Sequence, residues 1–352
     1  PRPSRPPRIA FFNPFGAPAA NSAAILAHIG SGYTDTDWAS TVASFNVKVD
    51  GTILELPGGP LRAAFGLDFR AEQFETGGES FLSGTAPRMT APVSYERDVS
   101  SAFAELRIPI VGPENAHVGI ERLELSLAGR VEDHERVGST SNPKVGLLFG
   151  PTPDLVLRAS WGTSFRAPSL RELQSAYQIG PSFLSRGGGN VLTLIQYGGN
   201  PDLRPETAES TTAGFVWTPA AYEGLRLEGN WFRTRFNDRI GNPIIQNLAN
   251  ALNDPSFAPF VRYVSPTTSA EDRALVQALL DHPGNFNPTV FPATSYGVIV
   301  DNRFVNAAGF EVEGVDLSAR YRFELSGWQA TIDGTVTHCL LYTSPSPRDG
   351  LL

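Results

Sequence analysis

Apolar and polar residues alternate along most of the chain with a period of two. In LRAAFGLDFRAE (61–72), leucine, alanine and phenylalanine occupy the odd positions, and arginine, aspartate and glutamate occupy even ones. LELSLAGRVED (123–133) and LVLRASWGTSFR (155–166) repeat this alternation. Successive side chains of an extended backbone point to opposite faces, so these segments are predicted to be β-strands with one apolar and one polar face.

The same pattern predicts about ten strands. Their expected ranges are 38–49, 60–76, 98–110, 120–135, 142–150, 154–166, 208–218, 224–238, 304–323 and 327–338. Several exceed ten residues, whereas strands of soluble proteins usually have about five or six, so their length favours a large barrel. Near Gly314 the apolar positions change from even to odd numbers, which predicts a β-bulge.

The connections between the expected strands alternate in length. Short ones are IVGPENAHVGIE, FGPTPD, TPAAYEG and FELSG; long ones cover about 77–97, 167–207 and 239–303, and the short VGSTSNP is the exception. Every second connection of an up-and-down meander lies at the same end, so one end carries tight turns and the other carries large loops. Outer-membrane barrels show this asymmetry, with short periplasmic turns and long extracellular loops.

Two short helices are expected within the loops. TTSAEDRALVQALLDHPG has Ser269 as a helix N-cap, Asp272 three residues later and Pro283-Gly284 as a stop signal. Its predicted apolar face consists of Leu275, Val276, Leu279 and Leu280. NSAAILAHIG, near the start of the chain, is the second candidate.

The predicted fold class is all-β: an antiparallel up-and-down transmembrane β-barrel with a polar lumen and an apolar face toward lipid. Closure pairs every backbone group, as hydrocarbon requires. Aromatic residues at strand ends fit an interfacial girdle: Phe165, Trp217, Trp231 and Trp328. The alternative is a soluble β-sandwich or propeller whose apolar faces form an ordinary core.

Composition excludes several other classes. The net charge of −8 argues against a nucleic-acid partner, for which a basic face is expected. Cys339 is the single cysteine, so no disulfide framework or cysteine-based metal site is expected. The five histidines have no ligand spacing, no nucleophile signature occurs, and GGGN (187–190) lacks the Lys-Ser/Thr of a phosphate loop. The sequence therefore predicts no enzyme, no metal and no cofactor.

Several segments together resemble the barrel of TonB-dependent outer-membrane receptors. They are FGLDFRAEQFE, AFAELRIPIVGP, the long run from LELSLAGRVED to SFRAPSLREL, NPDLRPETAES and VNAAGFEVEGVDLSARYRF. The resemblance covers about residues 10–338, and SFRAPS followed by NPDLRPE and a strand is its most specific part. It implies a 22-stranded barrel in the outer membrane of a Gram-negative bacterium, closed by an N-terminal plug domain.

The resemblance also implies a function. Such receptors bind scarce nutrients, such as iron–siderophore complexes, cobalamin or carbohydrates, and import them with energy delivered through TonB. The expected partners are therefore outer-membrane lipid, a small-molecule nutrient and the TonB complex, the last through a plug domain. The alternatives left open are a passive porin-like barrel and a secreted soluble β-rich carbohydrate-binding protein.

The chain is expected to be a fragment of such a receptor. It starts without Met in PRPSRPPR, and neither a plug domain, a TonB-contacting box nor a closing strand with a final aromatic residue is recognised. Residues 1–338 are interpreted as an incomplete barrel with about ten of the 22 strands. The last segment, CLLYTSPSPRDGLL (339–352), resembles translated adaptor sequence and is predicted to be a non-native tail.

Four residues are candidates for contacts with the nutrient. Tyr177, Phe183 and Tyr197 are aromatic residues of the long loop, and Arg166 ends a strand at the mouth of that loop. A structural ion pair between Arg166 and a lumen carboxylate is the favoured alternative for this arginine.

The NPDLRPE segment is interpreted as a structural element, not as a binding site. Its prolines fix φ, and the residues before them are driven toward extended backbone, so the segment is predicted to be a rigid re-entry from the loop into the strand at Thr211–Trp217. The residues of this signature are Asn200, Pro201, Leu203, Arg204, Pro205 and Glu206.

Overall fold

The computed structural model describes residues 12–13, 15, 21–81, 87–135, 137–285, 291–306 and 309–343. Two compact units divide the chain: Pro1–Val42 with Glu72–Glu96, and Ala43–Ala71 with Arg97–Leu352. The first unit contains α1 (Ala23–Ile29), the second predicted helix, which is confirmed. None of the helices in the described part of the chain is long and apolar enough to cross a membrane.

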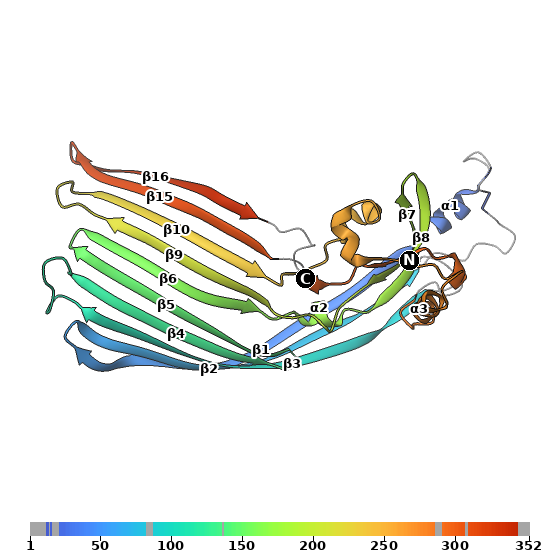
Figure 1. The fold of residues 1–352 in the computed structure, drawn as a ribbon, viewed down its shortest axis with the longest axis horizontal. Helices are drawn as coiled ribbons and strands as arrows, with labels where there is room; N and C mark the ends of the chain where they lie inside the picture. The colour runs from blue at the N-terminus through green and yellow to red at the C-terminus, as the bar shows by residue number, and fades with distance from the viewer. Residues whose placement is uncertain are drawn as a thin grey trace. The chain divides into compact units, whose positions relative to one another are not determined.

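Ten strands form one sheet in the order β1-β2-β3-β4-β5-β6-β9-β10-β15-β16, and neighbours from β3 onward pair antiparallel (Figure 1). The predicted meander of ten strands is therefore confirmed. The strands are β1 (Tyr33–Leu56), β2 (Gly59–Phe81), β3 (Arg88–Val111), β4 (Arg122–His134), β5 (Gly138–Thr152), β6 (Leu155–Arg166), β9 (Glu206–Trp217), β10 (Leu225–Asn237), β15 (Phe310–Leu325) and β16 (Trp328–Thr343).

One predicted loop is wrong. Most of the described residues between 77 and 97 are strand, because β2 continues through Phe81 and β3 starts at Arg88. In β2 the alternation fails there because polar residues and Gly77-Gly78 interrupt it. Gly78 has φ +151°, and a Cβ at this position would lie 2.2 Å from the carbonyl oxygen of Asp35. This close approach of two backbones requires glycine.

The two other long connections contain secondary structure of their own. Strands β7 (Gln178–Arg186) and β8 (Gly189–Tyr197) form a hairpin between β6 and β9, and GGGN lies at its turn. A four-stranded sheet in the order β12-β13-β8-β7 joins this hairpin to β12 (Val261–Tyr263) and β13 (Val298–Asp301). Because β13 pairs parallel with β8, one sheet unites both loops.

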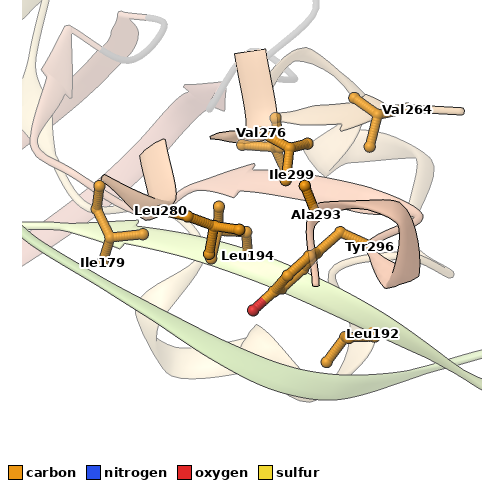
Figure 2. Close-up of a cluster of buried hydrophobic side chains, with 9 residues drawn as sticks. All are labelled: Ile179, Leu192, Leu194, Val264, Val276, Leu280, Ala293, Tyr296 and Ile299. Atoms are coloured by element: carbon orange, nitrogen blue, oxygen red, sulfur yellow. The ribbon is translucent and has the colours of Figure 1, made fainter. Parts of the chain in front are cut away.

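Apolar residues cover both faces of this four-stranded sheet. On one face, Leu192 and Leu194 of β8 and Ile299 of β13 pack with Val276 and Leu280 (Figure 2). On the other face, Ile195, Val298 and Val300 pack with residues of η2 (Ile245–Asn250), η3 (Pro255–Phe260) and their flanks. The four strands, η2, η3, η4 (Ala293–Ser295) and the helix Ala270–Leu280, which carries Val276 and Leu280, are called the loop subdomain. β11 (Ile240–Gly241) and β14 (Val305–Asn306) form a small antiparallel pair. In sequence, β11 follows β10 and β14 precedes β15.

Helix α3 (Ala270–Leu280) confirms the first predicted helix. The Ser269 side chain is the N-cap and accepts a hydrogen bond from the Asp272 backbone N–H at 3.1 Å. Val276 and Leu280 are buried, and Leu275 and Leu279 pack against the same cluster, so the predicted apolar face is the buried one.

We expect Ser269→Ala to lower the stability of the loop subdomain by about 1 kcal/mol, because the Asp272 N–H loses its acceptor. Hydrogen exchange of the amides in the first turn of α3 measures this change. Ser269→Asp, which supplies another capping oxygen, is expected to retain the protection; equal exchange in both variants would contradict the capping role.

The apolar face of the ten-stranded sheet is uncovered. Large side chains on it, such as Phe65, Phe69 and Phe215, are exposed, whereas the three clusters of buried apolar residues all come from the loop segments. A soluble sandwich would bury this face against a second sheet about 10 Å away. Within the described ranges no such layer exists, so this face is the one that meets lipid.

The polarity of this outer face changes at one level. The indole N–H of Trp161 donates to Glu209 at 3.0 Å, and that of Trp231 donates to Glu313 at 2.9 Å. On the side of the tryptophans where β10 starts, the outer face is apolar. On the other side, toward the end of β10, it carries the ion pairs of Arg233 and Arg235 with Glu311. These tryptophans therefore mark the boundary between hydrocarbon and headgroups.

This boundary corrects one sequence prediction. Trp231 was expected at a strand end but lies within β10, which continues beyond the membrane. The β-bulge predicted near Gly314 is confirmed. The register between β15 and β16 shifts between Glu313 and Gly314, with the extra residue in β16, while β15 keeps its register with β10. The apolar residues change parity because the outer face leaves the lipid.

Candidate functional site

The base of the loops begins where β6 ends. Residues 167–169 lead into the short helix α2 (Leu170–Gln174), which starts with a capping box. The Ser169 hydroxyl accepts from the Glu172 N–H at 3.2 Å, and the Glu172 carboxylate accepts from the Ser169 N–H at 2.8 Å. Both groups are satisfied locally, so the chain turns sharply out of the barrel wall at a fixed position.

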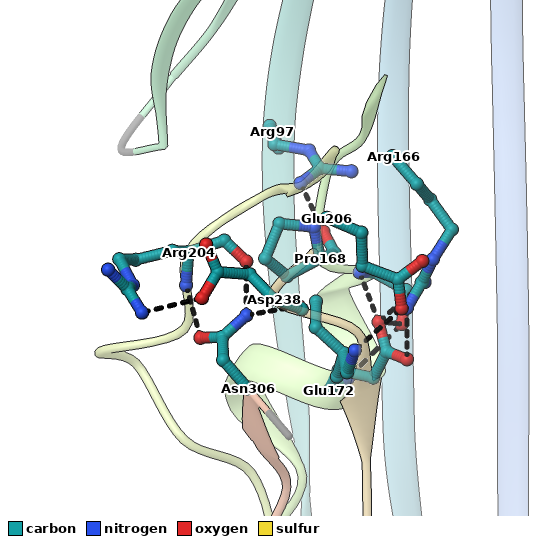
Figure 3. Close-up of polar contacts among 10 residues, drawn as sticks. Arg97, Arg166, Pro168, Glu172, Arg204, Glu206, Asp238 and Asn306 are labelled. Carbon is teal, nitrogen blue, oxygen red and sulfur yellow. Dashed lines mark hydrogen bonds and ion pairs between the residues drawn. The ribbon is translucent and has the colours of Figure 1, made fainter. Parts of the chain in front are cut away.

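Arg166 joins this turn to the signature segment. Its guanidinium donates to the Glu172 carboxylate at 2.9 Å and to Glu206 at 2.7 Å (Figure 3). The same Glu206 oxygen accepts the backbone N–H of Ile240 at 2.6 Å. The start of one loop, its return and the start of the next loop therefore meet at one carboxylate. These charge-assisted bonds, first to Glu206 and then to Glu172, raise the pKa of Arg166, so it stays cationic.

The signature residues before Glu206 are anchored as well. The Asn200 side chain donates to the Phe304 carbonyl oxygen at 2.9 Å and accepts from the Asp202 N–H at 3.0 Å. Leu203 is buried with Leu173 and Ile240. Pro201 and Pro205 complete the segment, and β9 begins directly afterward at Glu206, as a rigid re-entry into the strand requires.

Asn306 connects the signature to the second long loop. Its amide oxygen accepts from the Arg204 N–H at 2.8 Å, and its amide nitrogen donates to the carbonyl oxygens of Arg204 and Asp238. The Arg204 guanidinium contacts the Asp238 carboxylate at 2.6 Å, largely in solvent. The Asn306 side chain thus holds the backbone of the signature, and Arg204 and Asp238 add an exposed ion pair.

We expect Asn306→Ala to destabilise the loop base by about 2 kcal/mol, because three backbone groups lose their partner together. Arg204→Ala, which removes only the exposed ion pair, serves as the control and is expected to cost less than about 1 kcal/mol. Hydrogen exchange of the Arg204 and Ile240 amides in the full-length protein distinguishes the two variants; equal effects would contradict the role of Asn306.

A second arginine, from a more distant strand of the sheet, holds the same turn. Arg97 of β3 is buried and donates to the carbonyl oxygen of Pro168 at 2.7 Å. The FRAPS segment is therefore held from β3 on one side and from Glu206 on the other. The charged groups of this loop base bind each other and backbone groups, which indicates a structural role.

The sequence from residue 8 to residue 350 matches a family described as TonB dependent receptor-like, beta-barrel. The chain belongs to this family of TonB-dependent receptors. Its barrel is a fold of the outer membrane, and the uncovered apolar face of the ten-stranded sheet agrees with that location.

Named relatives cover parts of the chain. An iron-regulated outer membrane virulence protein of Vibrio cholerae is 30% identical over 121 residues, which are 34% of this chain and 16% of the relative. The vitamin B12 transporter BtuB of Vibrio cholerae is 27% identical over 169 residues, 48% of this chain and 21% of the relative. The chain thus matches a minor part of each relative's length.

Solved structures show the same fold. A mutant ferric enterobactin receptor from Pseudomonas aeruginosa, in complex with enterobactin, superimposes with a TM-score of 0.54 at 17% identity. The match covers 90% of this chain and 37% of that receptor. The ten strands therefore correspond to a part of a receptor barrel.

The three aromatic candidates of the receptor's long loop lie in different environments. The Tyr177 hydroxyl donates to the Gln196 side chain at 2.5 Å, and its ring meets His282 edge-on. Tyr197 packs against the buried cluster of Val298. Burial raises the pKa of both phenols, so they stay protonated. Phe183 is 58% exposed and contacts Phe291 edge-on, so it is the candidate with the most accessible ring.

The structure adds residues that the sequence did not single out. Asp238, Ile240 and Asn306 complete the loop base, although they lie 34, 34 and 102 residues from their partners in the signature. No local pattern marks them, because an aspartate after a strand and an asparagine in a very short strand are common. No cluster of three His, Cys, Asp or Glu residues suited to a metal ion occurs among the described residues.

The predicted boundary at Cys339 lies inside a strand. β16 runs to Thr343, and its pairing with β15 continues past Cys339 to Glu311 opposite Thr343. The origin of residues 339–352 stays a prediction, and residues 344–352 lie outside the described ranges.

Proposed function

We propose that the chain is part of an outer-membrane receptor that binds a scarce nutrient and imports it with energy delivered through TonB. The match to the receptor family over residues 8–350 carries this proposal. An iron–siderophore complex is the first candidate nutrient, since one relative is iron-regulated and the matched structure is a ferric enterobactin receptor. Cobalamin and carbohydrates are the other candidates, cobalamin because of the likeness to a vitamin B12 transporter.

Phe183 is the proposed nutrient contact that the structure supports best, because its ring is exposed on the loop subdomain. Tyr177, Tyr197 and Arg166 are proposed contacts with a second role, since their side chains also hold the subdomain and its base together. Substitution of these three is therefore expected to disturb folding as well as binding.

Growth of a bacterium that lacks its own receptors tests the function. The full-length gene is expressed, and ferric siderophores, cobalamin and oligosaccharides are supplied in turn as the limiting nutrient. We expect growth on one of them, and loss of growth when TonB is deleted. TonB-independent uptake would identify a passive porin-like barrel. Recovery of the protein in the soluble fraction, without heat-modifiable gel mobility, would instead support a secreted binding protein.

A further inference from the structure

Three segments of the chain meet where the two long loops enter the loop subdomain. They are Gln196 near the end of β8, Asn242 after β11 and Asn302 after β13. The Asn302 backbone N–H donates to the Gln196 carbonyl oxygen at 2.9 Å, and the Asn302 carbonyl oxygen accepts from the Asn242 side chain at 2.7 Å. These three residues are called the neck. The neck ties the start of the second long loop to its end, 60 residues later, and to the first loop.

The side-chain amide of Asn302 is buried without a hydrogen-bond partner in the part of the chain that the structure describes. Only 1% of this residue is exposed, and neither the amide oxygen nor the amide nitrogen has a protein partner. Exchanging the two atoms by rotation of the amide gives no improvement, because both are unpaired. An asparagine amide can make up to four hydrogen bonds, and burial without any of them costs free energy. The Asn302 amide therefore points to a small bound molecule.

Asn242 adds a second unpaired oxygen to the neck. Its amide nitrogen donates to the Asn302 carbonyl oxygen, and the opposite orientation of the amide would place two acceptor oxygens 2.7 Å apart. The amide oxygen of Asn242 is then the buried atom that lacks a partner among the described residues. Ordinary amide bond lengths place it within about 5 Å of the Asn302 carbonyl oxygen. Unpaired acceptors and an unpaired donor thus occur together at the neck.

Other polar side chains beside the neck are satisfied by the protein itself. Asp301 and Arg303, on either side of Asn302 in the sequence, bind each other through two hydrogen bonds, at 2.9 and 2.7 Å. The side chain of Asn306 makes three hydrogen bonds to backbone groups. The unpaired amide groups of the neck are therefore an exception to their surroundings.

We propose that the neck binds at least one internal water molecule, which forms hydrogen bonds to the side chains of Asn242 and Asn302. The two amide oxygens require a donor, and the amide nitrogen of Asn302 requires an acceptor. Water supplies both, whereas a metal cation serves only the oxygens and an anion serves only the nitrogen. Buried waters typically make about three hydrogen bonds, and the two amides offer three unpaired atoms. The two loops are thus connected through water, a property that does not depend on the proposed uptake function.

A crystal structure of the full-length receptor, at a resolution that shows ordered water, tests the site directly. We expect water density within hydrogen-bond distance of both the oxygen and the nitrogen of the Asn302 amide. Absence of such density, or an Asn302 side chain that is turned toward a protein partner, would overturn the proposal. A peak with six or more oxygen ligands at about 2.4 Å would identify a calcium ion and would overturn it as well.

Asn302→Leu gives a second test, because the direction of its effect separates a hydrated amide from an unpaired one. Leucine removes hydrogen bonds to the water, so we expect the backbone amides of β8 and β13 to exchange their hydrogens about tenfold faster. If the amide were buried without water, leucine would relieve its cost, so slower or unchanged exchange would contradict the proposal. Asn250→Leu, at an exposed amide of η2, is the matched control and is expected to leave exchange unchanged. Heat-modifiable gel mobility verifies that the barrel of each variant is folded.

Discussion

Val298→Asp is expected to unfold both long loops of the receptor while the barrel stays folded. Val298 is fully buried in β13, which pairs with β8 of the other loop. An unpaired carboxylate at this position costs about 4 kcal/mol or more, an amount that a small subdomain cannot tolerate. Because β8 and β13 share one sheet and one core, the loss of one loop removes the core of the other.

Limited proteolysis of intact cells measures this effect. In the wild type, the compact subdomain is expected to protect both loops from an added protease, and Val298→Asp is expected to abolish this protection in both. Val118→Asp is the matched control, because Val118 lies fully exposed in the connection between β3 and β4. Heat-modifiable gel mobility of each variant shows whether its barrel is folded. If Val298→Asp and Val118→Asp were equally resistant, the loops would not fold as one unit.

Glu206→Ala is expected to reduce assembly of the full-length barrel more than it reduces nutrient affinity. The carboxylate of Glu206 is the acceptor shared by Arg166 and the Ile240 N–H, so its removal leaves a partly buried N–H without a partner. The cost is about 2 kcal/mol, since Arg166 keeps its contact with Glu172 and is half exposed. Arg204→Ala is expected to act in the same direction but more weakly, as its ion pair lies largely in solvent.

The fraction of receptor with heat-modifiable mobility measures assembly, and titration of the folded fraction measures affinity. Glu206→Gln is a matched variant, because its amide oxygen can still accept the Ile240 N–H; we expect an intermediate loss of assembly. Normal assembly of Glu206→Ala together with a large loss of affinity would contradict the structural role. Such a result would make the signature part of the binding site.

The sequence allowed the large sheet to be predicted because lipid on one side and water on the other impose strict alternation. Where that contrast ends, the prediction failed. At the end of β2, polar residues and two glycines interrupt the alternation, so the 77–97 segment was taken for a loop. β8 and β13 are short apolar runs buried on both faces, and such runs show no period of two.

The candidate site was predictable only in part, for a related reason. SFRAPS and NPDLRPE stood out as segments of a known family, and the prolines indicated a rigid turn. The residues that complete the base, Asp238 and Asn306, contact the signature across 34 and 102 residues of chain. Their pairing depends on the register of β10 and on the path of the second loop, which no local pattern contains.

The two hydrogen-bonded tryptophans also show how far β10 extends beyond the lipid. From Trp231, β10 continues for six residues to its end at Asn237. At about 3.4 Å per residue and a tilt of about 40°, the wall rises about 15 Å beyond the boundary that this tryptophan marks. The end of β10 therefore lies beyond the lipid headgroups.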